Sequence, residues 1–208
     1  MFVFATILMS CIYAIPAVIA FVVRGVAASN ARRQIKLAGQ TRTSQSSDDV
    51  SVAFLHANGI YDVPVEKGED YFTSSFDKKK KVVAISPDAY KCVDAYSIAR
   101  ALNACSQVLV NRNEPEKPAT YARVDTIATW CFWIAFCALS FAIMGASFVS
   151  ACLGYAALLP VWLNALAQVN FLKNSHKPVE KFLKDSGVFK SEEIKPILCA
   201  LAAIRVNR

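Results

Sequence analysis

Histidine is scarce in this chain of 208 residues, in which His56 and His176 are the only two. They stand far apart, and neither lies at a metal-ligand spacing from Cys105, so the sequence does not predict a zinc site that they share. The seven cysteines form no C-x-x-C pair and lie mostly in apolar runs. This pattern favours buried free thiols in a reducing compartment over a disulfide or zinc framework. No base can be identified that would activate Cys105 as a nucleophile, so packing is its predicted role.

Charge is missing from two long stretches. Residues 1–23 contain no charged side chain, and none occurs between Asp125 and Lys173. At ~1.5 Å per residue, the first stretch can cross a ~30 Å hydrocarbon core, and no basic segment precedes it as in a secretory signal. Residues 124–172 are too many for one span and suit two, with a tight turn near residues 145–150. We therefore predict about three transmembrane helices, in agreement with 55% hydrophobic residues and a mean hydropathy of +0.34.

Amides and small residues predict how the two helices of this hairpin pack. The carboxamides of Asn164, Gln168 and Asn170 are too polar for plain lipid contact, so we expect them to face the first helix or a partner protein. The small residues that would permit close helix contact are Ala142, Gly145, Ala146 and Ala151. The aromatic residues expected at the membrane interfaces are Trp130, Trp133, Tyr155 and Trp162.

The net charge of +7 is distributed in a way that predicts orientation. All 23 Lys and Arg residues lie between Arg24 and Arg123 or from Lys173 onward, so with three spans they share one side of the membrane. They are dispersed and no nucleic-acid motif accompanies them, so no nucleic-acid partner is predicted. A basic cluster after the first stretch is expected to contact anionic lipid headgroups, or to serve simply as the orientation signal. It consists of Arg24, Arg32, Arg33 and Lys36.

The predicted fold class is an α+β membrane protein, with a small domain of helices and an antiparallel sheet on the basic side. Its parts are a transmembrane helix (1–23), the α+β domain (24–123), a transmembrane hairpin (124–172) and C-terminal amphipathic helices (173–208). Within the domain we predict a loop over 39–49, a helix over 51–58 closed by Asn58-Gly59, and strands over 61–66, 71–76 and 81–85. One or two helices should run from Ser86-Pro87 to Val110, followed by a polar connection over 111–118. Further helices are predicted over 179–186 and from Ser191.

The helix expected over residues 97–109 has the spacing of a metal site without its ligands. Its apolar residues recur at helical spacing, so Asn103 and Gln107 share a face one turn apart. Two histidines at this spacing can bind one zinc ion, but a carboxamide is a poor zinc ligand. Ala104 removes any carboxylate base between the two positions. We expect the two amides to bond each other or a backbone group instead.

Three segments before this helix carry a resemblance to a known family: residues 57–66 (ANGIYDVPVE), residues 72–77 (FTSSFD) and residues 81–86 (KVVAIS) with Tyr90. They resemble the soluble part of the membrane-anchored neutral zinc metallopeptidases of bacteria, in which a run like NGLYDV leads to runs like LTDHYDP and KVVRLS. An H-E-x-x-H helix follows at a fixed distance in that family. The resemblance covers most of residues 50–195.

The same resemblance implies where the family's zinc site would fall. The positions of its first histidine, glutamate, second histidine and further acidic ligand are Asn103, Ala104, Gln107 and, near the end of the hairpin, Leu172. All four are replaced, and no carboxylate occurs between Asp125 and Glu180, so a small shift of the alignment would not restore the last. The resemblance therefore implies a degenerate member that binds no metal or other cofactor and is not an enzyme.

The function expected from these features is that of a structural accessory subunit in a larger membrane complex, with other membrane subunits as partners. A mitochondrial respiratory complex or ATP synthase is the expected setting, with the main domain on the matrix side of the inner membrane. This setting depends on the reduced cysteines, the basic face and the absence of a secretory signal. One alternative is a pseudo-peptidase that binds polypeptides and regulates a membrane protease or chaperone. Another is an active hydrolase with different ligands.

Overall fold

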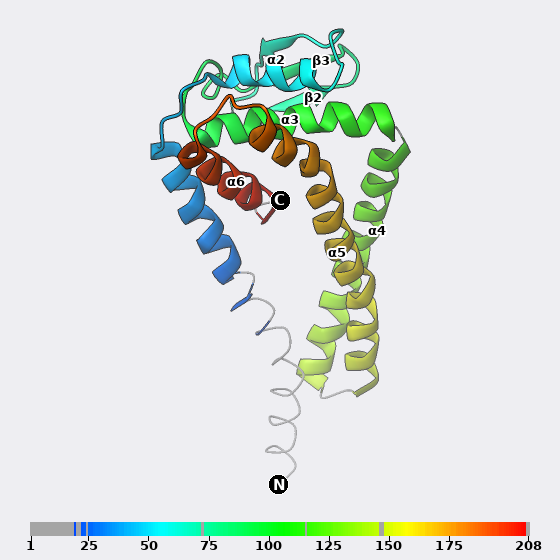
Figure 1. Cartoon of the computed structure of the whole chain (residues 1–208). Helices are drawn as coiled ribbons and strands as arrows, with labels where there is room; N and C mark the ends of the chain where they lie inside the picture. Colours follow the sequence, from blue (N-terminus) through cyan, green and yellow to red (C-terminus); the bar gives the residue numbers. More distant parts are fainter. Residues whose placement is uncertain are drawn as a thin grey trace. The chain divides into compact units, whose positions relative to one another are not determined.

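The computed structural model describes residues 19, 22–23, 25–71, 73–114, 116–145 and 148–206. The chain divides into two compact units, drawn in Figure 1. The first, unit 1, comprises residues 1–27 and 118–170, and the second, unit 2, comprises residues 28–117 and 171–208. Most described residues are helical. The first predicted span, residues 1–23, lies outside the described residues except for positions 19, 22 and 23.

Unit 2 contains a small sheet and the helices that pack with it. A helix ends at residue 40, and the later elements are α2 (Ser47–Ala57), β1 (Val65–Lys67), β2 (Ser75–Asp77), β3 (Val82–Ile85), α3 (Ala95–Asn113) and α6 (Ser191–Val206). The long helix α5 (Phe148–Asp185) contributes its last 15 residues, 171–185, to this unit. The helix α3 is the centre of the unit, because α2, α6, β2 and β3 all pack against it.

The sheet is mixed, so the prediction of an antiparallel sheet was wrong for one of its two pairings. Its strand order is β1-β3-β2, with β1 parallel to β3 at Val65 and Val83, and β2 antiparallel to β3. The chain reverses once between β1 and β2 and again between β2 and β3. Because β3 occupies the centre, its pairing with β1 must be parallel. Alternating apolar residues predicted the strands but carry no information on which one is central.

Two helices begin at residues other than those predicted, because the residue that caps the N-terminus of each helix lies elsewhere in the sequence. The helix α2 begins at residue 47 rather than 51, where Ser46 accepts a hydrogen bond from the Asp49 backbone N–H at 3.4 Å. The helix α3 begins at residue 95 rather than at the Ser86-Pro87 pair, with Asp94 accepting from the Ser97 N–H at 2.8 Å. The intervening residues 87–91 form a turn. The predicted stop after α2 is confirmed by Gly59, whose φ is +71°.

The predicted helix over residues 179–186 is helical up to Asp185, but it is the end of the continuous helix α5 and not the separate helix that was predicted. Pro178 lies inside the continuous helix, although a proline removes one helical hydrogen bond at a cost of about 3 kcal/mol. Val179, Phe182 and Leu183, in the turns that follow, are buried in the core of unit 2. Their burial offsets the cost of the proline. The predicted helix from Ser191 is confirmed as α6, with Glu192 and Glu193 in its first turn.

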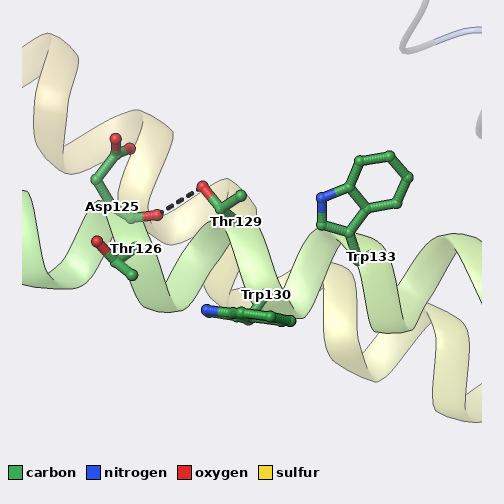
Figure 2. Close-up of a pocket in the computed structure, with 5 residues that line it drawn as sticks. All are labelled: Asp125, Thr126, Thr129, Trp130 and Trp133. Atoms are coloured by element: carbon green, nitrogen blue, oxygen red, sulfur yellow. Dashed lines mark hydrogen bonds between the residues drawn. The ribbon is translucent and has the colours of Figure 1, made fainter.

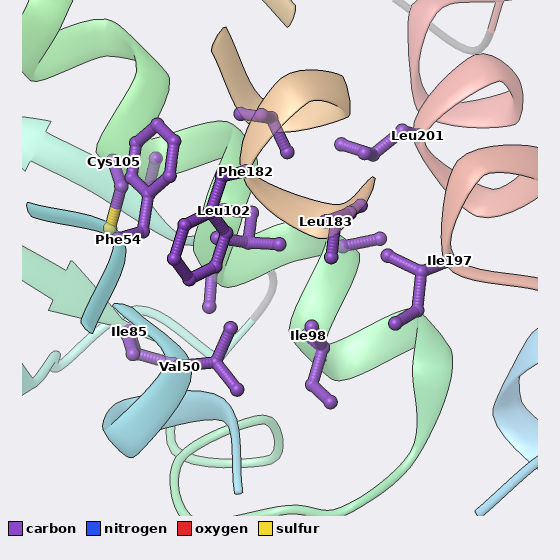
Figure 3. Packing of buried hydrophobic residues seen from close by; sticks show 14 of the residues in the cluster. Val50, Phe54, Ile85, Ile98, Leu102, Cys105, Phe182, Leu183, Ile197 and Leu201 are labelled. Carbon is purple, nitrogen blue, oxygen red and sulfur yellow. The ribbon is translucent and has the colours of Figure 1, made fainter. Parts of the chain in front are cut away.

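The core of unit 2 joins side chains from distant parts of the sequence, as Figure 3 shows. Phe54 of α2 meets Phe182 of α5 edge to face, with ring centroids 5.4 Å apart. Ile98 and Leu102 of α3 lie fully buried in the same cluster. The apolar face predicted for residues 97–109 is therefore the face that α3 turns into the core.

Unit 1 contains two long apolar helices, α4 (Glu116–Gly145) and residues 148–170 of α5. Both helices are long and apolar enough to cross a membrane, which supports the predicted hairpin. Their large apolar side chains are mostly exposed, as lipid contact requires. The polar connection predicted over 111–118 is shorter, because α3 continues to Asn113 and α4 begins at Glu116. Pro118 lies in the first turn of α4, where its missing N–H costs no helical bond.

Candidate functional site

The first predicted zinc-ligand position, Asn103, lies in the middle of α3 and is 94% buried. Its Oδ1 atom is 2.8 Å from Nε2 of His176, which lies on α5 and is fully buried. A carboxamide oxygen is an acceptor only, so this ring nitrogen carries the proton that forms the bond. The structure thus places an imidazole beside the position of the first metal ligand, one helical turn beyond Leu172.

The second predicted position, Gln107, lies one turn further along α3 and is half-buried. Its Oε1 atom accepts a hydrogen bond from the backbone N–H of Phe76 in β2, at 3.5 Å. Of the two arrangements expected for these amides, Gln107 therefore adopts the bond to a backbone group. Asn103 adopts neither, because its partner is a side chain on another helix.

The position of the missing glutamate, Ala104, is fully buried on α3. Its neighbour Cys105 is also fully buried, and its thiol lies 4.0 Å from the backbone oxygen of Ser51. Burial away from water raises the pKa of the Cys105 thiol to about 12, so the thiol stays protonated at neutral pH. A protonated buried thiol is neither a good nucleophile nor a good metal ligand. The packing role predicted for this cysteine agrees with this environment.

The donor groups at this position do not fit a zinc ion. They are one imidazole, which already bonds Asn103, and the carboxamides of Asn103 and Gln107. Zinc sites are built from thiolates, imidazoles and carboxylates, and a catalytic site uses three of them. Within the described part of the chain, no group of three or more His, Cys, Asp or Glu residues could hold a metal ion. Sequence reasoning missed the pairing of His176 with Asn103, since 73 residues separate the two.

The predicted lipid-contact residues lie on a surface helix. Arg32, Arg33 and Lys36 are exposed on the helix that ends at residue 40, while Ala31 and Ala38 of the same helix are buried. The basic side chains therefore point away from the core of unit 2. Both lipid contact and a plain orientation signal remain predictions for this cluster. Its fourth member, Arg24, lies outside the described residues.

Fold and site together define a mostly helical protein of two units, with two helices long and apolar enough to cross a membrane and a buried Asn103–His176 pair at the predicted metal position. Residues 10–203 match the model of the family described as "Putative neutral zinc metallopeptidase". The chain belongs to this family of zinc metallopeptidases, and the family predicted from the sequence is confirmed. No curated protein and no solved structure matches the chain.

Proposed function

We propose that this chain is a non-catalytic member of its metallopeptidase family and serves as a structural accessory subunit of a larger membrane complex. The observation that carries the proposal is the buried bond between Asn103 and His176. In this arrangement, the imidazole of His176, beside the predicted metal position, forms a hydrogen bond that joins α5 to α3. A hydrolytic zinc site needs this space for a metal ion, its water and a base.

The hairpin and the exposed apolar surface of α4 and α5 support the second half of the proposal. A chain without catalytic activity still has its apolar hairpin and its exposed surfaces, and both can bind neighbouring subunits. The setting that we propose is the mitochondrial inner membrane, with unit 2 in the matrix. The cysteines in the described part of the chain are free, as a reducing compartment requires.

Metal analysis tests the loss of catalysis. The full chain, purified in mild detergent and equilibrated with zinc, should hold much less than one zinc ion per chain by elemental mass spectrometry. It should also cleave no peptide. One zinc ion per chain, lost in His176→Ala and kept in the matched control His56→Ala, would overturn the proposal. Such a result would favour an active hydrolase with different ligands, since His56 is exposed and His176 is buried.

Native mass tests the accessory role. The protein is extracted gently, separated by native electrophoresis, and the comigrating proteins are identified by mass spectrometry. We expect it to migrate with a defined set of membrane subunits at fixed stoichiometry. Migration alone, at 22.8 kDa plus detergent, would exclude a stable accessory role. If that monomer bound unfolded polypeptides, the regulatory pseudo-peptidase would become the better description.

A further inference from the structure

A groove on α4 lies at the start of the apolar segment of this helix. Asp125, Thr126, Thr129, Trp130 and Trp133 line it, as Figure 2 shows. The apolar part of α4 begins at residue 123, so Asp125 is its last charged group on entering the membrane. The two indoles are 67% and 56% exposed, and tryptophan is enriched at this depth of the bilayer.

The carboxylate in this groove is held in place by the other helix of the hairpin. Asn164 donates a hydrogen bond from Nδ2 to Oδ1 of Asp125 at 3.2 Å, and Gln168 donates from Nε2 to the same oxygen at 2.7 Å. Asn164 is 93% buried, and its own Oδ1 has no hydrogen-bond partner among the residues that the structure describes. Both amides therefore present donors to Asp125, which is the arrangement that suits an ionised carboxylate.

The second carboxylate oxygen, Oδ2 of Asp125, accepts no hydrogen bond from any residue that the structure describes. Asp125 is exposed, so this oxygen is available to a group outside the chain. Nearby, Thr129 donates its hydroxyl proton to the backbone oxygen of Asp125 at 2.9 Å, which leaves the hydroxyl oxygen free to accept. The open side of the groove is thus lined by oxygen acceptors and indole rings.

These groups select a cation that can donate hydrogen bonds. An indole face attracts an ammonium group, and a carboxylate oxygen accepts a charge-assisted hydrogen bond from it. One carboxylate is too few ligands for a calcium or magnesium ion. A trimethylammonium group has no N–H to donate, whereas a primary ammonium has three. Because the groove is open and lies at the start of the predicted span, a lipid headgroup can reach it without a partner protein.

We propose that the Asp125 groove binds the primary ammonium headgroup of an ethanolamine phospholipid. The ammonium group donates to Oδ2 of Asp125, the rest of the headgroup lies in the groove that the indoles line, and the acyl chains follow the apolar surface of α4. This inference requires that the hairpin is inserted in a membrane. It does not depend on the accessory role or on the loss of zinc, so it can fail without affecting either.

Lipid retention by the full chain tests the proposal. The protein is reconstituted with equal amounts of phosphatidylethanolamine, phosphatidylcholine and phosphatidylglycerol of identical acyl chains, and the bound lipids are counted by native mass spectrometry. We expect preferential retention of phosphatidylethanolamine. Asp125→Asn keeps an oxygen for Asn164 and Gln168, and should weaken this retention about tenfold through the loss of one charge-assisted bond. The matched control Asp185→Asn removes the same charge from the exposed end of α5 and should change nothing.

Trp130→Ala supplies a second variant, because this exposed side chain can be removed without opening the core. It should weaken retention of both the ethanolamine and the choline lipid, since both headgroups would lie in the groove that this indole lines. Equal retention of the two lipids by the unchanged protein would overturn the proposal, and so would an Asp125→Asn variant with unchanged preference. If Asp125→Asn instead released a comigrating protein, the groove would belong to a basic residue of a partner helix.

Discussion

At the scale of single residues, a buried hydrogen bond lies at the position where the family resemblance predicts the first metal ligand. Asn103 and His176 are both buried, and the bond between them joins α3 to α5. A zinc ion would join the same helices through its ligands. A neutral pair does so without a metal, provided that both polar groups stay bonded, because a buried polar group without a partner is costly.

Replacing Asn103 by alanine should therefore lower the free energy of unfolding by about 1–3 kcal/mol, since the buried imidazole loses this partner. Asn113→Ala, at the exposed end of α3, is the matched control and should change it by less than about 0.5 kcal/mol. Circular dichroism during chemical unfolding in detergent is the suitable measurement, because all three tryptophans lie in unit 1. An unchanged midpoint for Asn103→Ala would show that the bond adds no stability.

A second residue-scale prediction concerns the ion pair between Asp88 and Arg100, whose atoms are 2.7 Å apart. Partial burial acts most strongly on this carboxyl and raises its pKa. The hydrogen bonds from Ser86 and Arg100, with the charge of Arg100, outweigh burial and hold the pKa of Asp88 below 3.8. Because the native value lies below the unfolded one, the ionised carboxylate stabilises the native state above pH ~4. This contribution is lost as the pH falls through the native value.

Asp88→Asn should accordingly lower stability at pH 6, and the difference from the unchanged protein should vanish in strong acid. We expect a loss below about 1 kcal/mol at pH 6, since the Asp88 side chain is 51% exposed. Unfolding midpoints at pH 6 and below pH 3 measure it. Asp62→Asn breaks the pair with Arg112, in which both side chains are at least half exposed (58% and 50%). It is the control and should have a smaller effect at pH 6. A difference that persists in acid would mean that Asp88 acts through packing and not through charge.

At the scale of elements, the hairpin of α4 and α5 depends on one close approach at a residue that was not predicted from the sequence. Ala142 and Ala151 are buried as predicted, and the tightest contact is at Gly154. A Cβ atom at Gly154 would lie 2.6 Å from Cγ and 3.2 Å from the backbone nitrogen of Leu139. Such distances are too short for non-bonded atoms, so the glycine allows the two helices to approach each other.

Gly154→Ala should therefore destabilise the hairpin by about 1–3 kcal/mol, although alanine is the better helix former. In the double variant Gly154→Ala with Leu139→Ala, the smaller side chain at residue 139 leaves room for the added Cβ atom. This variant should recover part of the lost stability. Tryptophan fluorescence during unfolding in detergent reports on this unit. Gly25→Ala, which lies in the same unit and has no atom within 4 Å of the added Cβ, is the control and should be neutral or slightly stabilising. A Gly154→Ala variant as stable as the control would show that the helices lie further apart.

At the scale of the whole molecule, the distribution of charge predicts how the chain lies in the membrane. Every Lys and Arg residue lies outside the apolar segments, and the predicted spans place all of them on one side. The turn between α4 and α5 should then face the opposite side.

Single cysteines at three exposed positions test this topology. Asn113→Cys and Lys190→Cys lie at the end of α3 and before α6, and Met144→Cys lies one residue before the end of α4. In sealed vesicles, a membrane-impermeant maleimide should label the first two from one side and the third from the other. Peptide-resolved mass spectrometry separates these sites from the native cysteines. Labelling of all three from the same side would exclude a hairpin that crosses the membrane.

The sequence by itself determined the features that depend on neighbouring residues. Long uncharged stretches predicted the two apolar helices, since crossing a membrane requires only length and hydrophobicity. The stop at Asn58-Gly59 and the start at Ser191 followed from the local chemistry of helix ends. The apolar spacing of residues 97–109 predicted the buried face of α3. The family followed from short runs of residues at fixed distances.

Only the tertiary structure decided which distant residues meet. It paired Asn103 with His176 across 73 residues, and Asp125 with Asn164 and Gln168 across about 40. The sequence predicted that these two amides of the hairpin would face protein, but it could not choose between the first helix and a partner. The tertiary structure also placed β3 at the centre of the sheet, and it showed that α5 continues through Pro178 into the core of unit 2. Each of these outcomes depends on the path of the whole chain, because a long-range contact is stabilised by burial that no local pattern contains.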